Sequence, residues 1–94
     1  MKIVWSETAV RDLGEIRAYI AEHNPKAAHG TAMAIIQAAN RLADFPASGR
    51  MGRIADTREL VIANLPFILP YTVNDGEVVI LAAFHEARKW PDKL

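Results

Sequence analysis

Apolar and polar positions in the first half of the chain follow the spacing of helices. A short β-prone segment, Lys2–Trp5, precedes Ser6, a residue type that caps helix N-termini. Apolar residues then recur three and four positions apart, which predicts one face of an amphipathic helix: Val10, Leu13, Ile16 and Ile20. The segment His23–Pro25 ends this helix and starts a second, because asparagine is a good N-cap and proline fits the first helical turn.

The second predicted helix is rich in alanine. One of its sides carries small and aliphatic residues: Ala28, Ala32, Ile35, Ile36, Ala39 and Leu42. Small side chains let two helices approach closely. The tight link between the two segments therefore predicts an antiparallel helical hairpin.

Period-two patterns replace the helical spacing in the second half. After the breaker cluster Phe45–Gly49, the segment Arg50–Asp56 is polar and is expected to be a loop. Three strands are predicted beyond it: Thr57–Ile62, Phe67–Val73 and Glu77–Phe84. Turns at 64–66 and 74–76 separate them, and the Asn-Asp-Gly sequence of the second turn favours a hairpin.

Two details of these strands bear on the sheet. Pro70 has no N–H to donate, so its strand is expected to lie at an edge there or to carry a bulge. The segment Glu77–Phe84 is apolar on both faces, which is typical of a central strand. The order β-α-α-β-β-β predicts an α+β domain. In it the helical hairpin packs on one face of a small, largely antiparallel sheet and leaves the other face partly open.

Composition narrows the function more than the fold. The length of 94 residues predicts a single domain over 1–94, and 51% hydrophobic residues suffice for a packed core. The chain has no cysteine, which excludes disulfide scaffolds, thiolate zinc sites and cysteine nucleophiles. We find no converging ligand set and no glycine-rich phosphate loop, so neither a metal nor a cofactor is expected. Without a signal-like N-terminus or a membrane-length apolar run, the expected compartment is the cytoplasm.

The overall charge balance hides a local excess of arginine. The chain has 11 Lys and Arg against 11 Asp and Glu, which lowers the expectation of broad nucleic-acid binding. Residues 50–58, however, hold Arg50, Arg53 and Arg58 against Asp56 alone. Guanidinium groups suit the recognition of phosphates and carboxylates. The alternative is ordinary solvated surface or an ion pair, such as one between Arg58 and a nearby glutamate.

Four further residues are candidates for chemistry or binding. His85 and Arg88 follow the predicted central strand, where a rigid backbone can hold a site. His85 can act as an acid or base near neutral pH, although a histidine that caps the sheet is the commoner interpretation. The position of Tyr71 in the period-two pattern of its predicted strand favours core packing over a chemical role. Trp90 is expected to anchor the tail on the sheet, with stacking against a base as the alternative.

Short motifs occur in a fixed order over nearly the whole chain. In the first half they are Val4-Trp5-Ser6, Asp12-Leu13, Tyr19-Ile20-Ala21 and Asn24-Pro25. In the second half they are Phe45-Pro46, Ser48-Gly49-Arg50, Thr57-Arg58-Glu59-Leu60-Val61, Pro70-Tyr71, His85-Glu86-Ala87-Arg88 and Trp90-Pro91. Each motif is weak alone. In this order and spacing the chain resembles the RelE/ParE superfamily of bacterial type II toxin–antitoxin toxins.

The resemblance implies a small toxin that a cognate antitoxin, ParD-like or RelB-like, neutralises in a hetero-oligomeric complex. Two branches of the superfamily differ in their target. RelE-like members cleave mRNA in the ribosomal A site. On that branch Arg58 and Arg88 would stabilise the phosphate transition state and His85 would be the acid or base. ParE-like members instead poison DNA gyrase and are not nucleases.

Departures from the RelE-like pattern favour the ParE-like branch. The tail has Trp90-Pro91 and no tyrosine, and the neutral charge is unlike that of a nuclease which faces dense ribosomal phosphate. We therefore expect a gyrase inhibitor with no membrane partner. A RelE-like endoribonuclease and an inactive binding module of the same fold are the alternatives. The candidate contacts to the target or the antitoxin are Arg50, Arg53, Arg58, Tyr71, Arg88 and Trp90.

Overall fold

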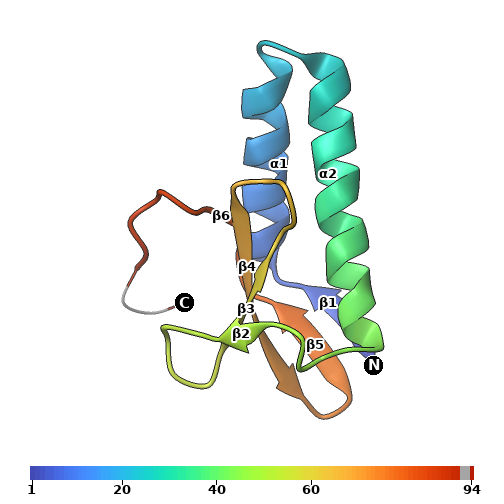
Figure 1. Ribbon diagram of the computed structural model, residues 1–94, viewed down its shortest axis with the longest axis vertical. Coiled ribbons are helices and arrows are strands. Elements are labelled where there is room, and N and C mark those ends of the chain that lie inside the picture. The colour runs from blue at the N-terminus through green and yellow to red at the C-terminus, as the bar shows by residue number, and fades with distance from the viewer. Residues whose placement is uncertain (92–93) are drawn as a thin grey trace.

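The computed structural model describes residues 1–91 and 94, in which two helices stand against one face of a mixed sheet (Figure 1). The predicted single domain over 1–94 includes Asp92 and Lys93, which lie outside the described residues. The elements are β1 (Lys2–Trp5), α1 (Glu7–Ala21), α2 (Pro25–Asn40), a 3-10 turn (Arg41–Ala43), β2 (Arg50–Met51), β3 (Arg58–Val61), β4 (Phe67–Asn74), β5 (Glu77–Ile80) and β6 (Phe84–His85).

The sheet order is β1-β5-β4-β3-β2, and β6 also pairs with β4. The first strand, β1, lies parallel to β5, and the chain between the two comprises the helical hairpin and the strands β2, β3 and β4. All other neighbouring strands are antiparallel. The predicted α+β class and the order β-α-α-β-β-β are therefore confirmed, with β2 and β6 as two additional short strands.

Both predicted helix caps are present. The Ser6 hydroxyl accepts a hydrogen bond from the Ala9 N–H at 3.0 Å, and the Asn24 side chain accepts one from the Ala27 N–H at 3.1 Å. Each cap satisfies a backbone donor that the first helical turn leaves without a partner. Pro25 occupies the first turn of α2, where its missing N–H costs nothing. The hairpin is thus set by local sequence.

The core lies between the hairpin and the sheet. Alanines line the buried side of α2, where they allow close packing against α1. From the sheet, Leu69, Tyr71, Val78 and Ile80 enter this core with no solvent exposure. Alternate residues of β4 therefore face the helices, and the residues between them point to the opposite face, which we call the tail face.

Two predicted boundaries are wrong. The segment Arg50–Asp56 is not entirely loop, because Arg50 and Met51 pair with β3. The predicted strand Glu77–Phe84 is not continuous, since regular pairing stops at Ile80 and resumes at Phe84. The strand β2 has only two residues, which are too few to show a period-two pattern in the sequence.

A bulge lies opposite Pro70, as one of the two expectations for that residue requires. Tyr71 pairs with Ile80 and Ile68 pairs with Phe84, so two residues of β4 face three residues of the partner strand. The Pro70 carbonyl accepts from Leu81 N–H at 2.9 Å, so its nitrogen also points to this interruption. Pro70 thus lies inside the sheet and not at its edge.

The tail face is not open at its centre, which corrects the expectation of an open sheet surface. Ile68, Pro70 and Phe84 lie on this face and are all buried. Trp90 packs against the Phe84 ring, with 4.8 Å between ring centroids, so the predicted anchoring of the tail is confirmed. Figure 1 shows the C-terminal segment leaving β6 toward the left of the view, on the side opposite α2. None of the helices in the described part of the chain is long and apolar enough to cross a membrane.

Two glycines weaken the helices. Gly14 and Gly30 are exposed inside α1 and α2, and a Cβ at either position would meet nothing within 4 Å. We expect Gly14→Ala and Gly30→Ala each to raise the free energy of unfolding by about 0.5–1 kcal/mol, because alanine loses less backbone entropy in a helix. Urea unfolding measures both changes.

Gly52→Ala is the contrasting variant in the same assay. A Cβ at Gly52 would lie 2.7 Å from the Thr57 carbonyl oxygen, so backbone would have to move and stability is expected to fall. A helix glycine variant that destabilised the protein as much as Gly52→Ala would contradict this interpretation.

Candidate functional site

Glu59 lies at the centre of the arginine cluster. Its side chain is only 2% exposed and its carboxylate accepts hydrogen bonds from two arginines. Arg50 donates Nη2 and Nε to Oε1 at 2.9 and 3.0 Å, and Arg53 donates its backbone N–H and Nε to Oε2 at 2.8 and 3.1 Å. A buried carboxylate requires such donors. This arrangement, the Glu59 clamp, ties the loop after β2 to β3.

The clamp changes the acidity of its carboxyl group. Burial raises the pKa of Glu59, but hydrogen bonds from the Arg53 backbone and from the Arg53 and Arg50 side chains outweigh it. The net result is a pKa below the ordinary value of 4.5. Glu59 is therefore ionised near neutral pH and cancels part of the charge of its two partners.

The predicted local excess of positive charge is accordingly smaller than the 50–58 window indicates. Glu59 falls one position beyond that window, and its carboxylate engages Arg50 and Arg53. Their side chains are still 54% and 45% exposed, so both remain accessible to a partner. The cluster is a structural clamp first and a candidate contact surface second.

Arg58 holds a loop, and among the described residues it does not form the ion pair with a glutamate that was the alternative interpretation. Its Nη1 donates to the carbonyl oxygens of Gly49 at 2.9 Å and Ala47 at 3.3 Å. The neighbouring Tyr71 hydroxyl donates to the Pro46 carbonyl at 2.8 Å and accepts from the Gly49 N–H at 2.9 Å. Together the two side chains fix the breaker loop, which explains why a charge alternates in phase with apolar residues.

Tyr71 has no solvent exposure, so the packing interpretation of its phase is correct. A side chain without exposed surface cannot contact a partner unless the core opens. We therefore remove Tyr71 from the candidate contacts to the target or the antitoxin.

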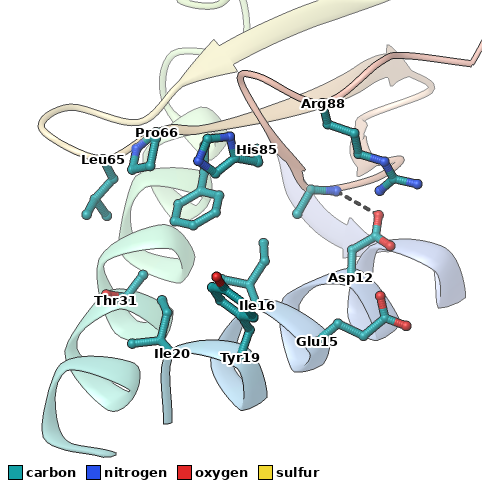
Figure 2. A pocket seen from close by; sticks show the side chains of 12 residues that line it. Asp12, Glu15, Ile16, Tyr19, Ile20, Thr31, Leu65, Pro66, His85 and Arg88 are labelled. Atoms are coloured by element: carbon teal, nitrogen blue, oxygen red, sulfur yellow. Dashed lines mark hydrogen bonds between the residues drawn. The ribbon is translucent and has the colours of Figure 1, made fainter. Parts of the chain in front are cut away.

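An apolar groove of about 580 Å³ lies between the hairpin and the start of β4 (Figure 2). Its walls come from α1, α2, the turn before β4 and β6. Tyr19 stands at the groove with 69% of its surface exposed. The principal lining residues are Ile16, Tyr19, Ile20, Thr31, Leu65, Pro66, Phe67, His85 and Arg88.

One end of the groove carries charges of both signs. Asp12 and Glu15 project from α1, and Arg88 projects from the C-terminal segment (Figure 2). The Asp12 carboxylate accepts a hydrogen bond from the Ala83 N–H at 3.0 Å, which holds α1 against the strand interruption. Glu15 and Arg88 remain as charged groups at the groove, so an occupant can be recognised by charge as well as by apolar contact.

His85 has a structural environment. Its ring stands edge-on to Phe67 with 5.7 Å between centroids, and its Nδ1 accepts a hydrogen bond from the Ala87 N–H at 3.1 Å. Nδ1 is thus used locally, whereas the residue as a whole is exposed. The arrangement agrees better with a histidine that ends the strand than with an oriented catalytic base.

The three residues of the nuclease hypothesis do not converge. His85 pairs with Phe67 on one side of β4, and Arg58 pairs with Tyr71 on the other side. Four residues of strand and two strand spacings separate them by roughly 16 Å at the backbone. Arg88 lines the groove with His85, while Arg58 lines a separate hollow of about 210 Å³ beside Val73.

Most of the groove is not marked in the sequence. Its residues come from four elements that only tertiary packing brings together, and the sequence indicates Tyr19 only as part of a motif. The one signal for the groove is that Tyr19 follows Ile16 by three residues and so lies beside the apolar face of α1. In residues 1–91 and 94, no group of three His, Cys, Asp or Glu side chains could hold a metal ion.

The Glu59 clamp makes a prediction about stability and pH. Glu59→Gln is expected to lower the free energy of unfolding by about 2–3 kcal/mol at neutral pH, because two charge-assisted interactions are lost. A carboxyl whose folded pKa is depressed stabilises the fold above its unfolded pKa, and this stability is lost as the pH falls through the folded value. Below about pH 4.5 the wild type should therefore lose stability more steeply than the variant. Urea unfolding at several pH values measures this, and parallel profiles would contradict it.

Comparisons with known proteins agree with this architecture. A family model described as "ParE toxin of type II toxin-antitoxin system, parDE" matches residues 3–90. Y4kP of Sinorhizobium fredii, named as a candidate toxin, is 45% identical over 93 residues, which cover 99% of this chain and 96% of that protein. Toxin RelE2 of Caulobacter vibrioides is 40% identical over 87 residues, 93% of this chain and 97% of its own length.

A solved structure shares the fold. The chain matches one described as "Chromosomal ParDE TA system from P. aeruginosa" with a TM-score of 0.83 and 24% sequence identity, over 90% of this chain and 95% of that one. The family model spans nearly all of the described chain, and the two relatives are 45% and 40% identical over almost their full length. The chain therefore belongs to the ParE toxin family of type II toxin–antitoxin systems.

Proposed function

We propose that this toxin inhibits DNA gyrase in the cytoplasm by binding it, without catalysis, and that a cognate antitoxin neutralises it. Membership of the ParE family is the observation that carries the proposal. The scattered positions of Arg58 and His85 support it, because an endoribonuclease must gather its groups around one phosphate. The neutral charge supports it as well, since ribosomal RNA rewards a basic surface.

The groove is the site that we assign to the antitoxin. Its apolar walls and the exposed Tyr19 ring offer surface that a segment with alternating or helical apolar side chains would cover. Glu15 and Arg88 at one end favour a segment that brings charges of both signs. An antitoxin segment that orders on binding would lose conformational entropy, which burial of these walls offsets.

The gyrase proposal predicts the outcome of parallel activity assays. Purified toxin is expected to stop gyrase supercoiling and to accumulate cleaved DNA, whereas translated mRNA remains uncut in primer extension. His85→Ala should leave gyrase inhibition within about twofold of wild type, since loss of a true acid or base costs on the order of 100-fold or more.

Two results would overturn the gyrase proposal. Unchanged gyrase activity with harmless expression would favour the inactive binding module. Cleavage of mRNA within codons, lost in His85→Ala and Arg88→Ala, would favour the RelE-like endoribonuclease. The 40% identity to a protein named toxin RelE2 makes this second assay necessary.

The groove assignment is tested with two exposed residues of α1. Tyr19 lines the groove and is 69% exposed, whereas Val10 is 57% exposed and lies outside the lining. Tyr19→Ala is expected to weaken antitoxin binding by about 1–3 kcal/mol, because an aromatic side chain loses its buried contact. Val10→Ala should change it by less than about 0.5 kcal/mol. Titration calorimetry with the antitoxin encoded beside the toxin measures both, and equal effects would contradict the assignment.

A further inference from the structure

Four side chains form a continuous stack that runs from the tail face to the groove. The Arg53 guanidinium carbon lies 3.7 Å from the centroid of the Trp90 ring. Trp90 lies 4.8 Å from the Phe84 ring centroid at an angle of 61°, and the Arg88 guanidinium lies 4.8 Å from the same Phe84 ring. The stack joins the loop after β2 to the C-terminal segment, two regions that are far apart in the sequence.

The Glu59 clamp sets the first member of this stack. The Arg53 side chain has many rotamers in solution, but its backbone N–H and Nε both donate to the Glu59 Oε2. Glu59 is buried in β3 and cannot move with the surface. The guanidinium is therefore held by its edge, and its flat face is left for the indole.

Few hydrogen bonds hold the described part of the C-terminal segment to the sheet. The Glu86 N–H donates to the Pro66 carbonyl at 2.8 Å, which is the last bond from the segment to β4 or its turn among the described residues. The next two bonds are local, since the N–H groups of Ala87 and Arg88 both donate to His85. Beyond Glu86, contact with the sheet depends on the stacked side chains.

We propose that residues Phe84–Pro91 form a strap that Trp90 fastens to the tail face, and that Glu59 and Arg53 are its positioning residues. The strap carries Arg88 at the mouth of the groove, so the position of the Arg88 guanidinium depends on whether the strap is packed on the tail face. A cation–aromatic contact of this kind changes a closed-to-open ratio about two- to fivefold, enough to favour closure but not to lock it. This inference goes beyond the proposed function, and its test needs neither gyrase nor antitoxin.

The test follows Trp90 alone. In a Trp5→Phe background, Trp90 is the only tryptophan of the chain. Acrylamide quenching of its fluorescence reports how often the indole leaves the tail face. Arg53→Gln is expected to increase the accessible indole about two- to fivefold and to shift its emission to the red, because the stack loses its cation. Arg53→Lys should restore part of the protection, since lysine keeps the charge.

Arg50→Gln is the matched control. Arg50 donates to the same Glu59 carboxylate, and the arginine that stacks on Trp90 is Arg53. Quenching in Arg50→Gln should stay close to that of the background. Circular dichroism melts confirm that each variant is folded at the assay temperature. For a variant of low stability, hydrogen exchange of the Trp90 indole N–H, measured by NMR, replaces quenching as the report of indole exposure. Equal quenching in Arg53→Gln and Arg50→Gln, or no change in either, would overturn the strap.

Discussion

The burial of β4 on both of its faces is the constraint on which the rest of the structure depends. The strand pairs with β3 on one side and with β5 and β6 on the other, and Phe67–Tyr71 are all buried. A chain of 94 residues has one helical layer, which covers one face. The other face needs a second cover, and the C-terminal segment provides it through Phe84 and Trp90. Because the same segment also supplies His85 and Arg88 to the groove, the covered face and the candidate site are structurally linked.

The arginines show how structure can use charge that composition assigns to function. Glu59 lies opposite Pro70, on the buried tail face, so its carboxylate needs donors there. Arg50 and Arg53 supply them, and Arg58 binds backbone carbonyls instead. With Asp56 and Glu59 counted, residues 50–59 hold three arginines against two acids, so the local positive excess is one charge. Such a small excess is consistent with the proposed function, in which the toxin contacts a protein target and not a nucleic acid.

Much of the fold could be predicted because its signals are local. The caps at Ser6 and Asn24, the apolar spacing of α1 and the Asn-Asp-Gly turn each act within a few residues. The groove could not be predicted in this way, since its walls join residues from Asp12 to Arg88. Pro70 allowed an edge or a bulge, but the apolar run opposite it has no residue that marks where strand pairing stops after Ile80 and resumes at Phe84. The motif resemblance identified the family, but it did not locate the groove.

The sequence by itself determined the α+β class, the order of the main elements, the hairpin caps and the ParE relationship. These follow from short-range propensities, apolar periodicity and the order of motifs. Only the tertiary structure decided which arginines are engaged, that Tyr71 is buried and that Glu59 holds the loop after β2. The physical reason is that the partner of a polar or charged side chain is set by long-range packing. The periodicity of the sequence does not indicate which residue that partner is.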